Sequence, residues 1–150
     1  MIFPQMKRKK TSYTIIVGCG RLGANLAQAL SDEGDEVLIL DRNEAAFHRL
    51  SSLYKGLTFV GDGMEWDVLK DVHIDEADAL VAVTDSDNAN IMIALLGREM
   101  FGVKNVVAQR YDPESECVYQ AFGIETICPA VLSARMIDKL LMKQSEACEA

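Results

Sequence analysis

Short runs of apolar residues, rich in Val, Ile and Leu, recur along the chain, and the segments between them have apolar residues at helical spacing. The short runs predict β-strands at residues 13–17, 36–40, 58–60, 79–83, 105–108 and 125–128. The segments between them predict six helices. The first ends near Gly34, the second begins at Asn43, and the third is short and covers Val68 and Leu69. The other three run from Asp87 to Phe101, from Pro113 to Gly123 and from Pro129 to about Leu141. Strands that alternate with helices form parallel sheets, because a parallel pair needs a crossover connection.

The order of these elements predicts an α/β fold: a Rossmann-like, doubly wound parallel sheet of six strands in the order 3-2-1-4-5-6, with helices on both faces. We expect the folded domain to span residues 13–142. Residues 1–12, which include the basic run from Lys7 to Lys10, are expected to form a flexible basic arm, and residues 143–150 a frayed tail. In such a sheet a ligand binds beyond the carboxyl ends of the strands, at the switch point between the first and the fourth.

The net charge of -8 narrows the range of functions. An acidic protein repels the phosphate backbone, so we expect no nucleic-acid partner. No apolar run approaches the roughly 20 residues that cross a membrane, and the first ten residues lack the apolar segment of a secretory signal peptide. The four cysteines have no C-x-x-C spacing, which favours reduced cytoplasmic thiols over a disulfide or zinc framework.

The first predicted strand ends in the glycine motif G-x-G-x-x-G, formed by Gly18, Gly20 and Gly23. At this position the motif is typical of a dinucleotide-binding turn. Gly18 permits the tight turn from strand to helix, Gly20 lets the backbone approach a pyrophosphate, and Gly23 lets the helix pack closely on the strand. The start of the helix offers free N–H groups and a partial positive charge to the phosphates.

The second predicted strand ends at Asp41, at the distance from the glycine motif where a carboxylate binds a ribose. Polar residues also follow the other strands: Gly61-Asp62-Gly63 after the third, Thr84-Asp85-Ser86-Asp87 after the fourth, and Gln109-Arg110 after the fifth. Because the carboxyl ends of parallel strands meet at one edge of the sheet, we expect one cleft to collect all of these residues.

These residues resemble those of a known family, the RCK or TrkA-N domain, a nucleotide-binding domain that regulates potassium channels and transporters. The matching positions extend through nearly the whole chain: residues 17–23, 37–41, 61–63 and 77–84, Asp87 with Asn90, Asp112-Pro113, and Phe122-Gly123 with Pro129. The resemblance implies a cytoplasmic regulatory subunit of a Trk/Ktr-type potassium uptake system, not an enzyme. Such a subunit binds a nucleotide and passes a conformational change to a membrane channel or transporter subunit at the inner face of the cell membrane.

The resemblance, together with the chemistry of each side chain, suggests roles in the cleft. Asp41 accepts hydrogen bonds from the adenosine ribose, and its charge repels a 2′-phosphate, which favours NAD over NADP. Arg42 leaves that preference open, since an Arg in this place either binds a 2′-phosphate or remains solvated. Arg21 donates to a phosphate, and Asp62 lies beside the adenine. Thr84 binds a ribose or a phosphate, or else caps the following helix.

The resemblance thus implies NAD or NADH as the ligand, or alternatively ATP, ADP or AMP, because all of these contain the adenosine that Asp41 and Asp62 would contact. The expected nucleotide-binding residues are Gly18, Cys19, Gly20, Arg21, Leu22, Gly23, Asp41, Arg42, Gly61, Asp62, Gly63, Thr84, Asp85 and Arg110. We expect no catalytic residue and no metal site.

Two features depart from the family pattern. Family members often carry Arg or Lys about three residues before the Asp-Pro pair, where this chain has Gln109, with Arg110 next to it. Since neighbouring strand residues point to opposite faces, Arg110 reaches the ligand only if the strand bulges. Many members also continue into a second, smaller ligand-binding domain. The sequence leaves open whether this chain is a single-domain regulator or a fragment, and whether a companion regulatory chain supplies the missing parts.

Two predicted helices are more apolar than one buried face requires. They are residues 90–96 with Met100 and Phe101, and the last helix with Val131, Leu132, Met136, Ile137, Leu140, Leu141 and Met142. We interpret them as surfaces of a homodimer or larger ring, with a deep core as the other interpretation. The alternative function is a small NAD-dependent oxidoreductase. That function needs an acid or base near the nicotinamide, and the sequence contains neither a Tyr-x-x-x-Lys pair nor a His at a strand end.

Overall fold

The computed structural model describes residues 11–112, 114 and 116–149. The strands of this part are β1 (Tyr13–Val17), β2 (Glu36–Asp41), β3 (Leu57–Val60), β4 (Ala79–Ala82), β5 (Asn105–Gln109) and β6 (Glu125–Ile127). The α-helices are α1 (Arg21–Asp32), α2 (Trp66–Asp71), α3 (Asp87–Leu95), α4 (Glu116–Ala121) and α5 (Pro129–Glu149). Two 3-10 helices, η1 (Glu44–Arg49) and η2 (Ile74–Glu76), and a π-helical segment, η3 (Leu96–Met100), complete the order.

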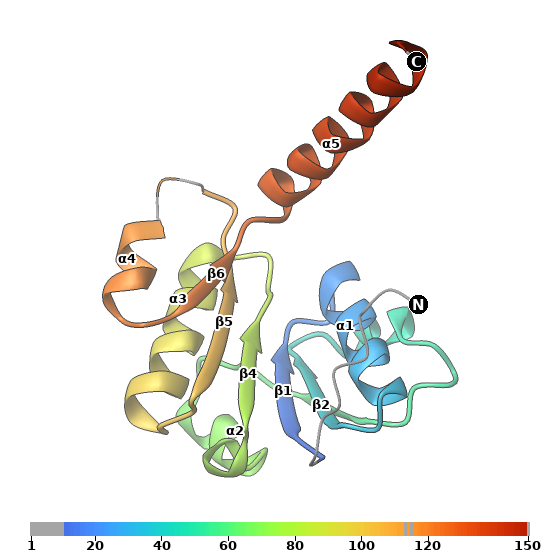
Figure 1. Cartoon of the computed structure of the whole chain (residues 1–150). Helices are drawn as coiled ribbons and strands as arrows, with labels where there is room; N and C mark the ends of the chain where they lie inside the picture. The colour runs from blue at the N-terminus through green and yellow to red at the C-terminus, as the bar shows by residue number, and fades with distance from the viewer. Residues whose placement is uncertain (1–10, 113, 115, 150) are drawn as a thin grey trace.

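The described strands form one parallel sheet in the order β3-β2-β1-β4-β5-β6. The strand order reverses at β1, with β2 and β3 on one side of it and β4, β5 and β6 on the other. Ile16 of β1 pairs with Ile39 of β2 on one side and with Val81 of β4 on the other. Figure 1 shows α1 on one side of the sheet and α3 with α4 on the other. The predicted doubly wound fold and its strand order are therefore confirmed.

Alternate residues of the central strands pack against opposite helical layers. Ile15 and Val17 of β1 belong to a core that includes Ile93 of α3, whereas Ile16 between them belongs to a core that includes Ala27 of α1. Successive strand residues point to opposite faces, so a strand covered on both faces is apolar throughout. This explains the uninterrupted apolar runs that the sequence shows, and each buried aliphatic side chain stabilises the sheet by about 1.5–3 kcal/mol.

Two helices differ in type from the prediction. The segment that Asn43 caps is the 3-10 helix η1, and the Asn43 side chain accepts the N–H of Ala45 at 3.1 Å, as expected of an N-cap. The helix predicted from Asp87 to Phe101 is α-helical only to Leu95 and continues as η3. Gly97 lies there against the sheet so closely that a Cβ would overlap the side chain of Leu80. The last turns of this helix thus follow the sheet surface.

The last helix is longer than predicted, since α5 continues past Leu141 to Glu149. Residues 143–149, which we expected to fray, are helical. Figure 1 shows α5 extending away from the sheet beyond β6. Its large apolar side chains are between 52% and 61% exposed, namely Leu132, Met136, Ile137, Leu140, Leu141 and Met142. These side chains therefore do not belong to a deep core of the chain itself.

The expected basic arm lies almost entirely outside the described residues. Ser12, which the sequence places in the arm, already joins the sheet: its carbonyl accepts the N–H of Glu36 at 3.0 Å, and its N–H donates to Asp35. Pro113, the expected start of a helix, also lies outside the described residues, and α4 begins at Glu116. The hydrogen bonding of the sheet thus starts at Ser12.

Candidate functional site

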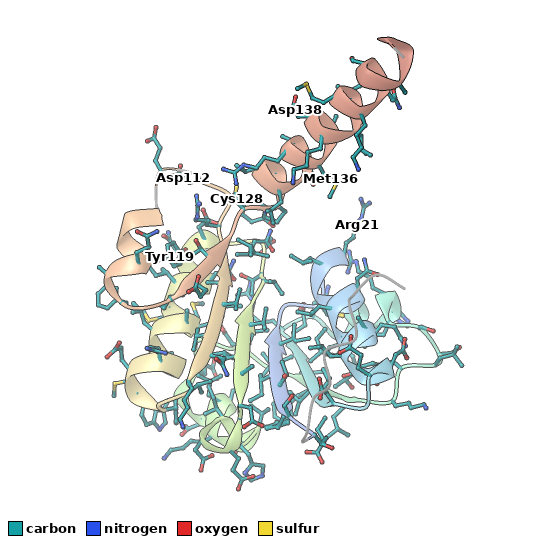
Figure 2. All side chains as sticks on the ribbon, in the orientation of Figure 1. Arg21, Asp112, Tyr119, Cys128, Met136 and Asp138 are labelled. Carbon is teal, nitrogen blue, oxygen red and sulfur yellow. The ribbon has the colours of Figure 1, made fainter. Side chains whose placement is uncertain are left out.

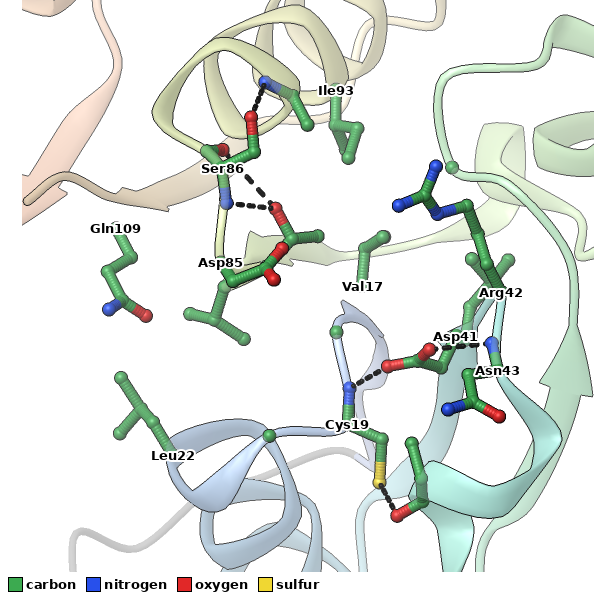
Figure 3. Close-up of a pocket in the computed structure, with 18 of the residues that line it drawn as sticks. Val17, Cys19, Leu22, Asp41, Arg42, Asn43, Asp85, Ser86, Ile93 and Gln109 are labelled. Carbon is green, nitrogen blue, oxygen red and sulfur yellow. Dashed lines mark hydrogen bonds between the residues drawn. The ribbon is translucent and has the colours of Figure 1, made fainter.

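A cleft of about 950 Å³ opens at the carboxyl ends of the strands. Its lining includes the glycine turn after β1, Asp41 and Arg42 at the end of β2, residues 61–63 after β3, residues 84–86 after β4 and Gln109 at the end of β5. Figure 3 shows side chains from these separate segments around one space. The cleft lies over the switch point between β1 and β4, which is where doubly wound sheets bind their ligands.

The turn after β1 depends on close backbone approaches that only glycine permits. Gly18 has a φ of 110°, its N–H donates to the carbonyl of Leu40 at 2.8 Å, and a Cβ there would lie 2.6 Å from the carbonyl oxygen of Val83. A Cβ on Gly23 would overlap the carbonyl oxygen of Gly18. A Cβ on Gly20, in contrast, would meet no atom within 4 Å. The fold needs Gly18 and Gly23, whereas the space at Gly20 is open and belongs to the cleft.

The N-terminus of α1 opens into the turn. Gly20 is the N-cap and provides no side-chain cap, and the first helical bond runs from the N–H of Ala24 to the carbonyl of Gly20 at 2.9 Å. The N–H groups of Arg21, Leu22 and Gly23 precede that bond, so the helix itself supplies no partner for them. These groups and the helix dipole favour an anion. Figure 2 shows the side chain of Arg21 extending outward from the start of α1, where it adds a positive charge.

Asp41 binds two backbone N–H groups at once. Its Oδ2 accepts the N–H of Cys19 and its Oδ1 accepts the N–H of Asn43, both at 2.8 Å (Figure 3). Each carboxylate oxygen keeps another lone pair. Asp41 is therefore able to accept the hydroxyl protons of a ribose while it holds the glycine turn against the end of β2.

The positively charged side chains among the described residues that line the cleft lie on one side of it. Arg21, Arg42 and Arg49 line it, and they come from α1, the end of β2 and the end of η1. Figure 3 shows the guanidinium of Arg42 directed into the cleft. The Nη1 of Arg49 donates to the carbonyl oxygen of Cys19 at 3.5 Å. The positive charge therefore lies beside the glycine turn and the carboxylate of Asp41.

Asn90 of α3 organises the opposite side of the cleft. It is fully buried, and its Oδ1 accepts the N–H of Thr84 at 2.9 Å and the hydroxyl of Thr84 at 2.6 Å. Its Nδ2 donates to the carbonyl of Thr84 at 3.1 Å and to the carbonyl of Gln109 at 3.0 Å. One amide thus joins the ends of β4 and β5. Ser86, not Thr84, is the N-cap of α3, with its hydroxyl accepting the N–H of Ala89 at 3.2 Å.

Arg110 points away from the cleft. Its Nε donates to the hydroxyl of Thr126 on β6 at 3.0 Å, and its Nη1 donates to the carbonyl of Asp112 at 3.1 Å. The backbone N–H groups of Tyr111 and Asp112 in turn donate to the carboxylate of Asp87 at 2.8 and 3.1 Å. These bonds fix the loop after β5, and the structure leaves Arg110 out of the cleft that the other predicted residues line.

The structure therefore brings most of the predicted residues together and adds others. The predicted residues that line the cleft are Gly18, Cys19, Gly20, Arg21, Leu22, Asp41, Arg42, Gly61, Asp62, Gly63, Thr84 and Asp85. Gly23 and Arg110 do not line it: Gly23 packs against the carbonyl of Gly18, and Arg110 bonds to Thr126 of β6 and to Asp112. Arg49 was not foreseen, because no motif in the sequence indicates that η1 folds over the turn. Gln109 lines the cleft where its neighbour Arg110 was predicted to do so, in line with the alternation of side chains along β5.

The Cys19 thiol in the turn is a packing group. Its side chain is fully buried, and its Sγ donates to the carbonyl of Ala46 at 3.3 Å. Burial, reinforced by the charge of Asp41, raises the pKa of the thiol above its ordinary value. A thiol that stays protonated is a poor nucleophile, so Cys19 fills space between β1 and η1. Cys19 and Cys128 are both free.

Within the part of the chain that the structure describes, no cluster of His, Cys, Asp and Glu has the arrangement of a metal site. No described helix combines the length and apolar character required to cross a membrane.

Comparison with known proteins gives matches along most of the chain. The model of the TrkA-N domain family matches residues 14–129. The Trk system potassium uptake protein TrkA of Streptomyces coelicolor is 43% identical over 135 residues, which cover 89% of this chain and 60% of that protein. The chain thus spans less than two thirds of the length of this relative.

Two solved structures are alike in fold. The GsuK RCK domain superposes with a TM-score of 0.76 at 24% identity, covering 91% of this chain and 29% of that chain. The Kef CTD of Shewanella denitrificans, solved in an AMP-bound form, superposes with a TM-score of 0.69 at 23% identity, covering 87% of this chain and 80% of that chain.

Proposed function

Because the chain belongs to the TrkA-N domain family, we propose that it is a regulatory module that binds an adenine nucleotide and thereby controls a membrane potassium channel or transporter. One observation carries the proposal: the glycine turn, the open N-terminus of α1 and the carboxylate of Asp41 border a single cleft. The 43% identical relative is named for potassium uptake, and a structure of the same fold binds AMP. Both support a nucleotide-dependent role in potassium transport.

In this proposal each side of the cleft receives a different part of the ligand. The adenosine ribose donates hydroxyl protons to Asp41, the adenine lies beside Asp62, and the phosphates lie over Gly20 and the N-terminus of α1. Arg21 and Arg42 supply positive charge to the phosphates. The ligand is NAD or NADH, with ATP, ADP or AMP as the alternatives that share adenosine.

The proposal includes assembly into a homodimer or a larger ring, with or without a companion regulatory chain. Its support is α5, which extends away from the sheet in Figure 1 and whose large apolar side chains are exposed. A helix with a water-exposed apolar surface of this kind is stable when a second copy covers it. Nucleotide binding that favours one arrangement of the copies shifts the equilibrium between two assemblies. The module would act at the inner face of the membrane through its pore-forming partner.

The test is a thermal-shift and calorimetric panel with NAD, NADH, NADP, ATP, ADP and AMP on the wild type and on Asp41→Ala. A ligand at 100 times its dissociation constant adds about 2.7 kcal/mol of stability, which gives a clear shift of the melting temperature. We expect stabilisation by adenine nucleotides that Asp41→Ala abolishes. Absence of any shift with all six ligands would contradict nucleotide binding by this chain.

The alternative function, a small NAD-dependent oxidoreductase, makes a different prediction for the same protein. A regulatory module binds NAD or NADH and returns it unchanged. We therefore expect the absorbance of NADH at saturating protein to stay constant in the presence of pooled carbonyl metabolites. Sustained oxidation of NADH would replace the regulatory proposal with an enzymatic one.

A further inference from the structure

The side-chain amide of Gln109 borders the cleft at the end of β5. The residue is only 6% exposed, and it lines the cleft as the last residue of the strand. Its backbone carbonyl accepts from Asn90, but its side-chain amide makes no hydrogen bond with any described residue. Figure 3 shows this side chain on the part of the cleft bordered by Asp85 and Leu22. Its amide oxygen and nitrogen remain accessible from the cleft, so they are available to hydrogen-bond a ligand.

Thr84 lies on the same side, and Asn90 determines which way its hydroxyl can bond. The N–H of Thr84 only donates, so the atom of Asn90 that it contacts at 2.9 Å is the amide oxygen. That same oxygen lies 2.6 Å from the Thr84 hydroxyl, which must therefore give its proton to Asn90. One lone pair of the Thr84 hydroxyl accepts the backbone N–H of Ser86 at 3.3 Å, and the other is left for the cleft. The hydroxyl can accept a proton from a sugar hydroxyl, but it has none to offer to a phosphate oxygen.

The charges on this side also disfavour a phosphate. The described lining residues after β4 and β5 include the carboxylate of Asp85, which Figure 3 shows in the cleft, and no cation. Arg110, the nearest cation in sequence, does not line the cleft and is bonded to Thr126 of β6 and to Asp112. Phosphates are thus attracted to the side of α1 and Arg42 and repelled from the side of Asp85.

The distance across the cleft fits a ligand with two nucleoside halves. Asp41 on β2 and Gln109 on β5 are separated by β1 and β4, which makes three strand spacings of about 4.8 Å. A dinucleotide lies across the switch point of such a sheet, with its pyrophosphate over the central turn. A mononucleotide anchored at Asp41 and the turn leaves the side of Gln109 unfilled.

We propose that Gln109 and Thr84 form a subsite for the second, uncharged nucleoside of a dinucleotide, and that Gln109 is the residue that makes this chain prefer NAD to ADP or ATP. The ribose donates to the hydroxyl oxygen of Thr84, and a neutral carboxamide or hydroxyl group bonds to the amide of Gln109. This inference rests on the proposed nucleotide binding and names the ligand class of the same cleft. Asn90 acts through Thr84 as a positioning residue.

The experiment is isothermal titration calorimetry of the full chain with NAD, ADP and ATP. The variants are Gln109→Met, which keeps the size of the side chain and removes its polar atoms, and Gln109→Arg, which adds a cation. We expect the wild type to bind NAD more tightly than ADP. Loss of one or two neutral hydrogen bonds should weaken NAD binding about five- to tenfold in Gln109→Met and leave ADP binding within about twofold. Gln109→Arg should move the preference toward ATP.

Gln28→Met is the matched control, because Gln28 lies on α1 outside the lining of the cleft and bonds to Asp32. It should change neither affinity. Equal weakening of NAD and ADP by Gln109→Met, or NAD binding no tighter than ADP binding in the wild type, would overturn the subsite while nucleotide binding itself stands. Failure of the wild type to bind any of the six nucleotides of the thermal-shift panel would overturn both proposals.

Discussion

The carboxylate of Asp41 accepts the backbone N–H of Cys19 at 2.8 Å, so the residue that ends β2 also holds the glycine turn that follows β1. The second carboxylate oxygen accepts the N–H of Asn43 at the start of η1. One side chain thus connects three segments that border the cleft. A ribose bound to Asp41 would contact a carboxylate that is already fixed in place, which reduces the entropy lost on binding.

Asp41→Ala should therefore weaken the fold as well as the binding of nucleotide. Two N–H groups lose an ionised acceptor, and we expect the free energy of unfolding to fall by about 1–3 kcal/mol. Urea denaturation without ligand measures this loss. Asp75→Ala, at an exposed position on η2, is the control and should stay within about 0.5 kcal/mol of the wild type. An unchanged midpoint for Asp41→Ala would mean that the carboxylate does not hold the turn.

Substitutions at two glycines of the turn should separate folding from binding. Gly23→Ala places a Cβ on the carbonyl oxygen of Gly18, so it should lower the melting temperature markedly. Gly20→Ala meets no atom within 4 Å and should leave the melting temperature nearly unchanged. In the proposed complex this Cβ occupies the space of the pyrophosphate, so Gly20→Ala should weaken nucleotide binding at least about tenfold. Normal binding by a stable Gly20→Ala protein would place the phosphates elsewhere.

The strand order and the position of the cleft could be predicted from the sequence because both follow from regular patterns. Strands buried on both faces are apolar throughout, and the polar residues that interrupt them mark the carboxyl ends. Gly18 and Gly23 are also predictable, since their roles depend on the backbone of a strand–turn–helix unit. Asp41 was predicted as a ribose ligand, but its bond to Cys19 was not, because no local pattern specifies which N–H groups a carboxylate meets after folding.

The other features of the site and of α5 could not be predicted, because they depend on tertiary contacts that no local sequence pattern indicates. Arg49 reaches the turn only because η1 folds over it. Gln109 and Arg110 are neighbours, and the direction of each follows from the exact register of β5, which a sequence prediction places only approximately. The extension of α5 to Glu149 was missed because its polar residues resemble a frayed end, although straight-chain residues such as Lys and Glu favour helices.

Asn90 should be far more important for stability than an exposed Asn with a similar bond. Asn90→Ala removes four hydrogen bonds at a fully buried position, which the backbone N–H, carbonyl and hydroxyl of Thr84 and the carbonyl of Gln109 make with Asn90. We expect a loss of about 3 kcal/mol or more in the free energy of unfolding. Asn105→Ala removes one exposed bond to the carbonyl of Asp78 and should cost about 1 kcal/mol or less. Equal losses in denaturant titrations would contradict this role of Asn90.

Tyr13 should make the protein sensitive to alkali. Its hydroxyl donates to the carbonyl of Val72 at 2.6 Å, and burial, together with the charges of Glu76 and Glu36, raises its pKa from 10.0 to about 12. The folded state thus retains a proton that the unfolded state loses. The resulting stabilisation is complete below pH 10 and disappears as the pH rises toward 12. Urea titrations from pH 8 to pH 11 should show a smaller decline for Tyr13→Phe than for the wild type, and parallel declines would exclude this contribution.

The apolar surface of α5 leads to a prediction about assembly. Ile137 and Leu141 are four residues apart, so they lie on the same side of the helix, and both are 57% exposed. If a second copy covers α5, the double variant Ile137→Glu and Leu141→Glu buries two charges in the contact and should sediment as a monomer at concentrations where the wild type is a dimer. The double variant Lys139→Gln and Lys143→Gln changes the net charge by the same amount without removing apolar surface. It should remain dimeric, since exposed charges contribute little. A wild type that sediments as a monomer at every concentration would contradict the dimer and would mean that a different chain covers α5. Dissociation by both pairs of substitutions would show that charge, not apolar contact, holds the copies together.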